Sequence, residues 1–164
     1  MKTTILVVLI IAFTATSVCL SQVGAKKSSD RRVERLLDEA DLKYEVDGDG
    51  DFTLVNGLKN DRSQIAWILS RTSKLGSLEI RQIWSVGYRS KSPLSETLAN
   101  RLLKENTQVK IGAWQVRKMG DDYVAVFCAQ IAADTDKETL LLALLAVTKT
   151  ADELEKELTD KDDF

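Results

Sequence analysis

The stretch from residue 93 to residue 131 constrains the fold of this chain most strongly, because it encodes a helix followed by two strands. Ser92 precedes Pro93, and a serine cap with proline at the first helical position is typical of a helix start. One face of this helix is committed to a core by leucines at a spacing of four residues, namely Leu94, Leu98 and Leu102. Asn106 is suited to end the helix, since asparagine tolerates the left-handed conformation.

Two strands are expected after this helix, over residues 111–118 and 123–131, with a hairpin turn at residues 119–122. The second strand carries apolar side chains on both faces. One face would hold Tyr123, Ala125, Phe127 and Ala129, and the other Val124, Val126 and Cys128. Strands with this pattern are typically central and covered on both sides.

The preceding residues add one more helix and four strand candidates. An apolar stripe begins at Val33, with Ser29 or Asp30 as the candidate cap. Strands are expected at residues 42–46, 52–55, 63–71 and 78–88, with turns at 47–51 and 74–77. The sequence therefore predicts the α+β class. We expect an antiparallel sheet of about five to six strands, with N-terminal, central and C-terminal helices packed on it.

A long helix closes the chain. Thr135 and Glu138 have the spacing of a capping box, in which each side chain binds an unpaired amide of the other. The run from residue 140 to residue 147 is apolar on all sides, which predicts burial on more than one side. Two explanations remain open, burial within the chain or a dimer interface, and the candidate partner-binding residues are Leu140, Leu142 and Leu145. The acidic tail, residues 159–164, is expected to be mobile.

The first 25 residues have the features of a secretory signal peptide. A charged start at Lys2 is followed by an apolar run, and small residues at positions 24 and 25 suit cleavage after Ala25. The alternative is an uncleaved N-terminal anchor, since the run is close to the length that spans a bilayer. Residues 26–30 would form a linker. We therefore expect a secreted or periplasmic protein of the cell envelope that contacts a membrane only through this segment, if uncleaved.

Several kinds of chemistry are disfavoured by the composition. The chain has no histidine, which removes the commonest general base and most catalytic zinc sites. Its net charge of −2 argues against a nucleic-acid partner. Cys128 would be the one cysteine left after cleavage, so we interpret it as a small buried hydrophobic residue. We predict no catalytic residue, no cofactor and no dedicated metal ligand, and hence no enzyme.

The acidic turn at residues 47–51 begins as calcium loops do, with aspartates at alternate positions. It then departs from that pattern, because Phe52 stands where glycine is needed and Leu58 where a bidentate glutamate belongs. A hairpin turn is the better interpretation, and a weak calcium site remains an alternative. Among the aromatic residues, Trp84 and Tyr88 are further candidates for binding, since their strand has a polar second face.

The order of elements resembles the YbjN domain, which is grouped with type III secretion chaperone-like folds. The resemblance rests on residues 44–52, 98–103 with Asn106, 110–114 and 151–154, and it covers residues 31–158. It implies a regulatory role in sensory transduction or stress response, no established active site, and relatives that bind other polypeptides as dimers. The signal-like start departs from the cytoplasmic members and argues against an intracellular role here.

Together these features predict an exported, non-catalytic protein-binding domain, chaperone-like or regulatory, with a protein or peptide partner or a second copy bound through its helices. The alternative is a small-molecule or calcium-binding module of the cell envelope. That module would use the Asp47 to Asp51 turn or the strand from Trp84 to Tyr88.

Overall fold

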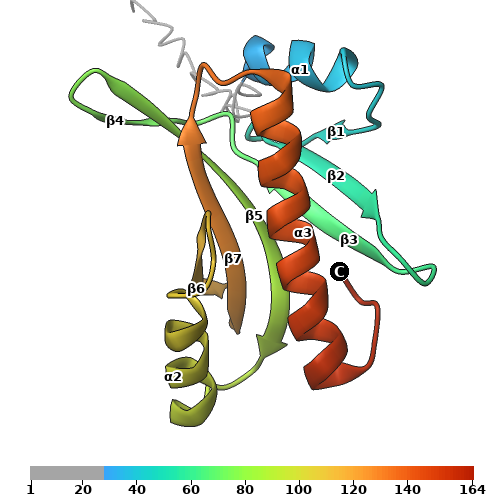
Figure 1. Cartoon of the computed structure of the whole chain (residues 1–164), viewed down its shortest axis with the longest axis vertical. Helices are drawn as coiled ribbons and strands as arrows, with labels where there is room; N and C mark the ends of the chain where they lie inside the picture. Colours follow the sequence, from blue (N-terminus) through green and yellow to red (C-terminus); the bar gives the residue numbers. More distant parts are fainter. Residues whose placement is uncertain (1–27) are drawn as a thin grey trace, which may run out of the picture.

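The structure is a computed structural model that describes residues 28–164, so the predicted signal segment lies outside the described residues. Within this range the chain has the α+β architecture predicted from the sequence (Figure 1). Among residues 28–164, no helix is both long and apolar enough to cross a membrane. The elements in chain order are α1 (Arg31–Asp38), β1 (Glu45–Val46), β2 (Phe52–Gly57), β3 (Ser63–Ile68), β4 (Ser73–Leu75), β5 (Leu78–Ser90), α2 (Glu96–Glu105), β6 (Ala113–Met119), β7 (Asp122–Ala132) and α3 (Lys137–Thr159).

The strands form one antiparallel sheet in the order β1-β2-β3-β5-β7-β6, and β4 pairs with the start of β5 outside this order. The hairpin predicted around residues 47–51 is confirmed, since Val46 pairs with Phe52 across it. The turn predicted at residues 74–77 is partly wrong, because Leu75 pairs with Leu78 and only the two residues between them turn the chain. Gly76 has a φ of 61°, which suits a two-residue hairpin turn and lets the strand continue up to it.

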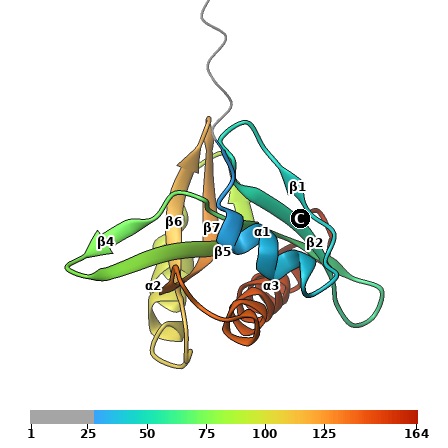
Figure 2. The same cartoon turned by 90° about the horizontal axis from the view of Figure 1, so that it is seen from above.

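All three helices contribute to one core on one face of the sheet. α3 runs beside β5, α1 lies near the first turn of α3, and α2 lies next to β6 at the other end (Figures 1 and 2). A second cluster contains Trp84, Val86, Val124, Val126 and Cys128, and it includes no buried residue of the described helices. β7 lies between β5 and β6 and contributes to both clusters, so the prediction of a strand covered on both faces is confirmed.

The helix caps agree with the sequence at α1 but differ at α2 and α3. Asp30 caps α1 by accepting a hydrogen bond from the Arg32 amide at 2.9 Å, as one of the two predicted alternatives. α2 begins later than predicted, because Ser95 and not Ser92 accepts from a helical amide. Asp136 caps α3 in place of Thr135, since its carboxylate accepts from the amide of Thr139 at 2.8 Å. A carboxylate at this position also interacts favourably with the helix dipole.

Asn106 ends α2 as predicted, but in the right-handed conformation, with a φ of −56°. Its side chain has a different task from the one expected. The Asn106 Oδ1 atom accepts a hydrogen bond from the Trp114 amide at 2.6 Å, which ties the end of α2 to the start of β6.

Gly87 allows α3 to approach the sheet closely, and we expect Gly87→Ala to lower the free energy of unfolding by about 2 kcal/mol. The register of β5 against β7 shifts between Val86 and Tyr88, so Gly87 lies at a bulge. A Cβ atom there would lie 2.8 Å from the Trp114 ring and 3.0 Å from the main-chain oxygen of Ala151 in α3. Urea denaturation measures the loss.

Gly57→Ala is the matched control for this change, because nothing lies within 4 Å of the Cβ position at Gly57. Equal midpoints for the two variants would contradict the close approach of α3 to β5 at Gly87.

The C-terminal tail was expected to be mobile, but the structure places it against the domain. The amide of Asp163 donates to the Glu155 carboxylate at 2.6 Å, and the ring of Phe164 packs against the second cluster. The Arg89 guanidinium lies 5.1 Å from the centre of the Phe164 ring. The expectation failed because an acidic composition does not reveal which cations and amides the tail meets.

Candidate functional site

The five partner-binding residues predicted from the sequence differ sharply in accessibility. Leu142 and Leu145 are 59% and 49% exposed on α3. Leu140 is only 1% exposed and belongs to the main core. Trp84 is buried in the second cluster, and Tyr88 is half-buried against the main core. Of the five, Leu142 and Leu145 are therefore the ones that a partner can reach directly.

Intrachain burial explains only half of the apolar run in α3. The side of the helix that faces the sheet buries Leu140, Ala143, Leu144 and Val147. Because a helix turns by 100° per residue, these positions cannot also bring Leu142 and Leu145 to the sheet. Two leucines of the run thus remain in water on the outer side of α3.

Charged residues flank these two leucines on the same side of α3. Glu138, Leu142, Leu145 and Lys149 follow one another at steps of four, three and four residues, and all four are exposed. We name these four residues the outer stripe. Lys149 also lies 3.8 Å from Glu153, but both side chains are about two-thirds exposed, so this pair constrains the lysine little.

An apolar groove of about 390 Å³ borders the outer stripe where α3 faces the first strands. Its apolar lining includes Leu42, Leu54, Ala66, Leu141, Leu144 and Leu145. Leu145 belongs to both the groove and the outer stripe. The exposed apolar surface of α3 is therefore continuous with a hollow and does not end at two isolated side chains.

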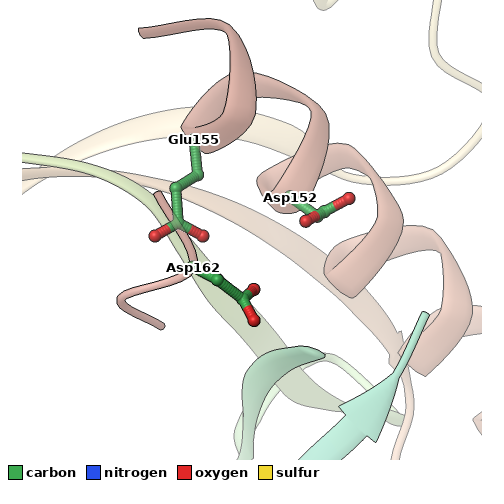
Figure 3. Close-up of side chains that lie close together, drawn as sticks. All are labelled: Asp152, Glu155 and Asp162. Carbon is green, nitrogen blue, oxygen red and sulfur yellow. The ribbon is translucent and has the colours of Figure 1, made fainter. Parts of the chain in front are cut away.

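Three carboxylates gather around one arginine at the other end of α3. Figure 3 shows Asp152 and Glu155 projecting from α3 and Asp162 projecting from the returning tail. The Arg62 Nε atom donates to Asp152 at 2.5 Å, and its Nη2 atom lies 3.6 Å from Glu155 and 3.8 Å from Asp162. We name these four residues the Arg62 cluster.

Burial raises the pKa of Glu155, which has no exposed side-chain surface, and the Asp163 amide and Arg62 oppose this rise. The three carboxylates lie within 4.8 Å of one another and offer oxygen ligands of the kind that calcium and magnesium prefer. The guanidinium of Arg62 already faces all three, so it supplies the cation that the cluster requires. We therefore assign the cluster to fastening the tail and the start of β3 onto α3.

The acidic turn uses its first carboxylate to shape the loop. Asp47 Oδ1 accepts hydrogen bonds from the amides of Asp49 and Asp51, at 2.8 and 3.0 Å. Asp51 in turn accepts from the amide of Ser70 at 2.7 Å, which attaches the turn to the segment that follows β3. These contacts are those of a hairpin turn, and calcium binding there stays a prediction.

Trp84, in the part of β5 that the sequence offered as an alternative binding site, is buried and not presented at the surface. The rings of Trp67 and Trp84 stack with centres 4.4 Å apart, and the Arg117 guanidinium lies 5.1 Å from the Trp84 ring. Cys128 is buried beside them with a free thiol, as predicted, and burial raises the pKa of that thiol. This face is better described as a packed cluster than as a ligand platform.

Sequence reasoning missed both the charges of the outer stripe and the Arg62 cluster. The outer stripe could have been recognised from the sequence, because Glu138 and Lys149 have helical spacing around the leucines. The Arg62 cluster could not have been recognised in this way, because Arg62 and Asp152 lie 90 residues apart and no sequence pattern joins them.

No family model, no curated protein and no solved structure matches this chain.

Proposed function

We propose that this chain is an exported, non-catalytic protein-binding domain, chaperone-like or regulatory, which associates with a second copy of itself through α3. The observation that carries the proposal is the exposure of Leu142 and Leu145 on a helix that is otherwise packed on the sheet. Burying a leucine side chain is worth about 1.5–3 kcal/mol, so a partner that covers both leucines gains substantially. The signal-like first 25 residues support the export.

The outer stripe is complementary to itself, which favours a second copy as the partner. In an antiparallel pair of α3 helices that places Leu142 opposite Leu145 of the other copy, Lys149 lies opposite Glu138 of the other copy. Two-fold symmetry repeats each contact, so such a pair joins four leucines between two salt bridges. α3 has 23 residues and is long enough to bring the neighbouring groove into the same interface.

The test is the mass of the full chain in solution, measured by size-exclusion chromatography with light scattering. We expect the parent to be a dimer and Leu142→Glu or Leu145→Glu to be monomeric, because each copy would then bury a carboxylate among leucines. Leu103→Glu is the matched control, since Leu103 is 63% exposed but lies on α2. A monomeric parent, or a dimer that survives both changes on α3, would disprove the proposal.

A charge swap tests the antiparallel arrangement. Lys149→Glu places like charges opposite each other twice, so we expect the dimer to weaken by about tenfold or more. Adding Glu138→Lys to the same chain restores opposite charges, and the doubly changed protein is expected to dimerise nearly as well as the parent. Association through any other surface would leave the swap without this recovery.

A further inference from the structure

β6 is the long free edge of the sheet. Within the described chain it pairs with β7 only, whereas the opposite edge, β1, has just two residues. A strand paired on one side directs every other main-chain N–H and C=O group outward. Asn106 already binds Trp114 on this edge, because its Oδ1 atom accepts from the Trp114 amide at 2.6 Å and its Nδ2 atom donates to the Trp114 carbonyl at 3.4 Å. The donors and acceptors that β6 offers to a further strand therefore lie beyond Trp114.

A small apolar cavity lies directly beside this edge, between α2 and β6. Its volume is about 150 Å³, and its lining includes Ala99, Leu102, Leu103, Trp114 and Val116. Leu103 is 63% exposed and Val116 is 52% exposed, so the cavity opens to solvent. Its size lies well below that of small-molecule pockets and suits a single aliphatic side chain.

The floor of this cavity is held in place by hydrogen bonds. The Trp114 indole N–H donates to Glu105 at 3.0 Å, and its amide donates to Asn106 at 2.6 Å. Arg101 also binds Glu105, at 2.7 Å, which compensates the charge of that carboxylate. The Trp114 ring that lines the cavity is thus held in position by side chains of α2 and by Asn106 at its end.

Exposed lysines lie on β6 and on the segment that leads into it. Lys118 lies two residues beyond Val116 on β6, and Lys110 belongs to the connection between α2 and β6; both are exposed. A second copy of β6 would bring further basic residues against these lysines, which is unfavourable. An acidic strand would instead find opposite charges.

We propose that the edge of β6 binds an extended acidic polypeptide segment as an additional strand, with one aliphatic side chain in the cavity and carboxylates facing Lys110 and Lys118. Main-chain hydrogen bonds hold the segment, and the cavity with the lysines selects its sequence. This site is separate from the outer stripe and does not depend on pairing through α3.

The probe for this proposal is a short, fluorescently labelled peptide of threonines, in which a central isoleucine has a glutamate two residues away on each side. We expect saturable binding to the full chain by fluorescence anisotropy. Replacing the glutamates with lysines, or changing Val116→Glu or Lys118→Glu in the protein, should weaken binding by about tenfold or more. A peptide with prolines at alternate threonines should not bind, since it lacks the amides that a new strand requires.

Leu142→Glu is the matched control in the protein, because it alters the outer stripe and leaves β6 unchanged. Unaltered peptide binding by this variant is expected even where the variant is monomeric. The proposal is overturned if the acidic peptide does not bind saturably, or if the lysine peptide and the Val116→Glu variant bind as well as their parents.

Discussion

We expect Asp30→Asn to lower the free energy of unfolding by about 3 kcal/mol, because it removes one partner of a buried ion pair. Arg81 is only 1% exposed, and its Nη2 atom lies 2.5 Å from the Asp30 carboxylate. Asparagine caps a helix about as well as aspartate, so the start of α1 is preserved and the loss reports the charged partner that Arg81 and Arg32 both lose. Chemical denaturation of parent and variant at neutral pH measures it.

The effect should depend on pH in a defined direction. Burial raises the pKa of Asp30, but hydrogen bonds from Arg32 and Arg81 outweigh it, so the pKa lies well below the ordinary value of 3.8. A carboxyl group with a lowered pKa stabilises the folded state above its unfolded pKa, and this contribution is lost as the pH falls through the folded pKa. The gap between parent and Asp30→Asn should therefore be constant at neutral pH and narrow below about pH 4.

Glu39→Gln is the control for this comparison. It breaks the exposed pair between Arg35 and Glu39 on the same helix, and such pairs contribute less than about 0.5 kcal/mol. If Asp30→Asn lowered the free energy of unfolding by no more than this control, the buried ion pair with Arg81 would not stabilise the fold.

Local patterns in the sequence were sufficient for most of the sheet. Alternation of apolar side chains predicted both faces of β7, because a strand between two neighbours must bury both of its faces. The same reasoning failed at β4, where Ser73–Leu75 has no apolar alternation and is a strand only because β5 extends beside it. Pairing of that kind depends on the partner strand, which a local window does not contain.

Helix starts were ambiguous for a related reason. Ser92 and Ser95 are both good caps by type, and Thr135 and Asp136 are adjacent alternatives. The choice depends on where the chain leaves the preceding strand, and that point is fixed by packing of α2 and α3 on the sheet. Element type was therefore predictable, whereas the first residue of each helix was not.

The candidate sites divide in the same way. The exposed leucines of α3 could be suspected from a run too apolar for one face, but only burial distinguishes Leu142 from Leu140. The β6 edge required knowledge of the strand order, since β6 precedes β7 in the chain yet ends the sheet. Arg62 and Arg81 pair with residues 90 and 51 positions away, beyond the reach of any motif.

Arg62→Met is expected to cost about 3 kcal/mol of unfolding free energy, because it leaves three carboxylates facing one another without their cation. Arg62 is itself largely buried, and Glu155 has no exposed side-chain surface. Methionine retains the apolar stem, so the loss reports the charge and not the packing. The tail should also loosen, which hydrogen exchange at the Asp163 amide would detect, since this amide binds Glu155.

Lowering the pH should reduce the loss of unfolding free energy that Arg62→Met causes, because Glu155 then becomes protonated. Burial already raises the pKa of Glu155 above its ordinary value of 4.5, and losing the opposing charge of Arg62 raises it further. A carboxyl group with a raised pKa is easier to bury when protonated, so its penalty declines as the pH falls toward that ordinary value. The difference between parent and Arg62→Met should thus be smaller near pH 5 than near pH 8.

Glu155→Gln separates this explanation from a simple loss of packing around Arg62. Glutamine retains an oxygen for the Asp163 amide and carries no charge, so in the Arg62→Met background it should recover about 1–2 kcal/mol. In the parent the same change should have little effect, because it removes both a costly buried charge and its attraction to Arg62. If Arg62→Met costs the same at both pH values and in the Glu155→Gln background, then Arg62 holds the tail by shape alone and the carboxylates do not need its charge.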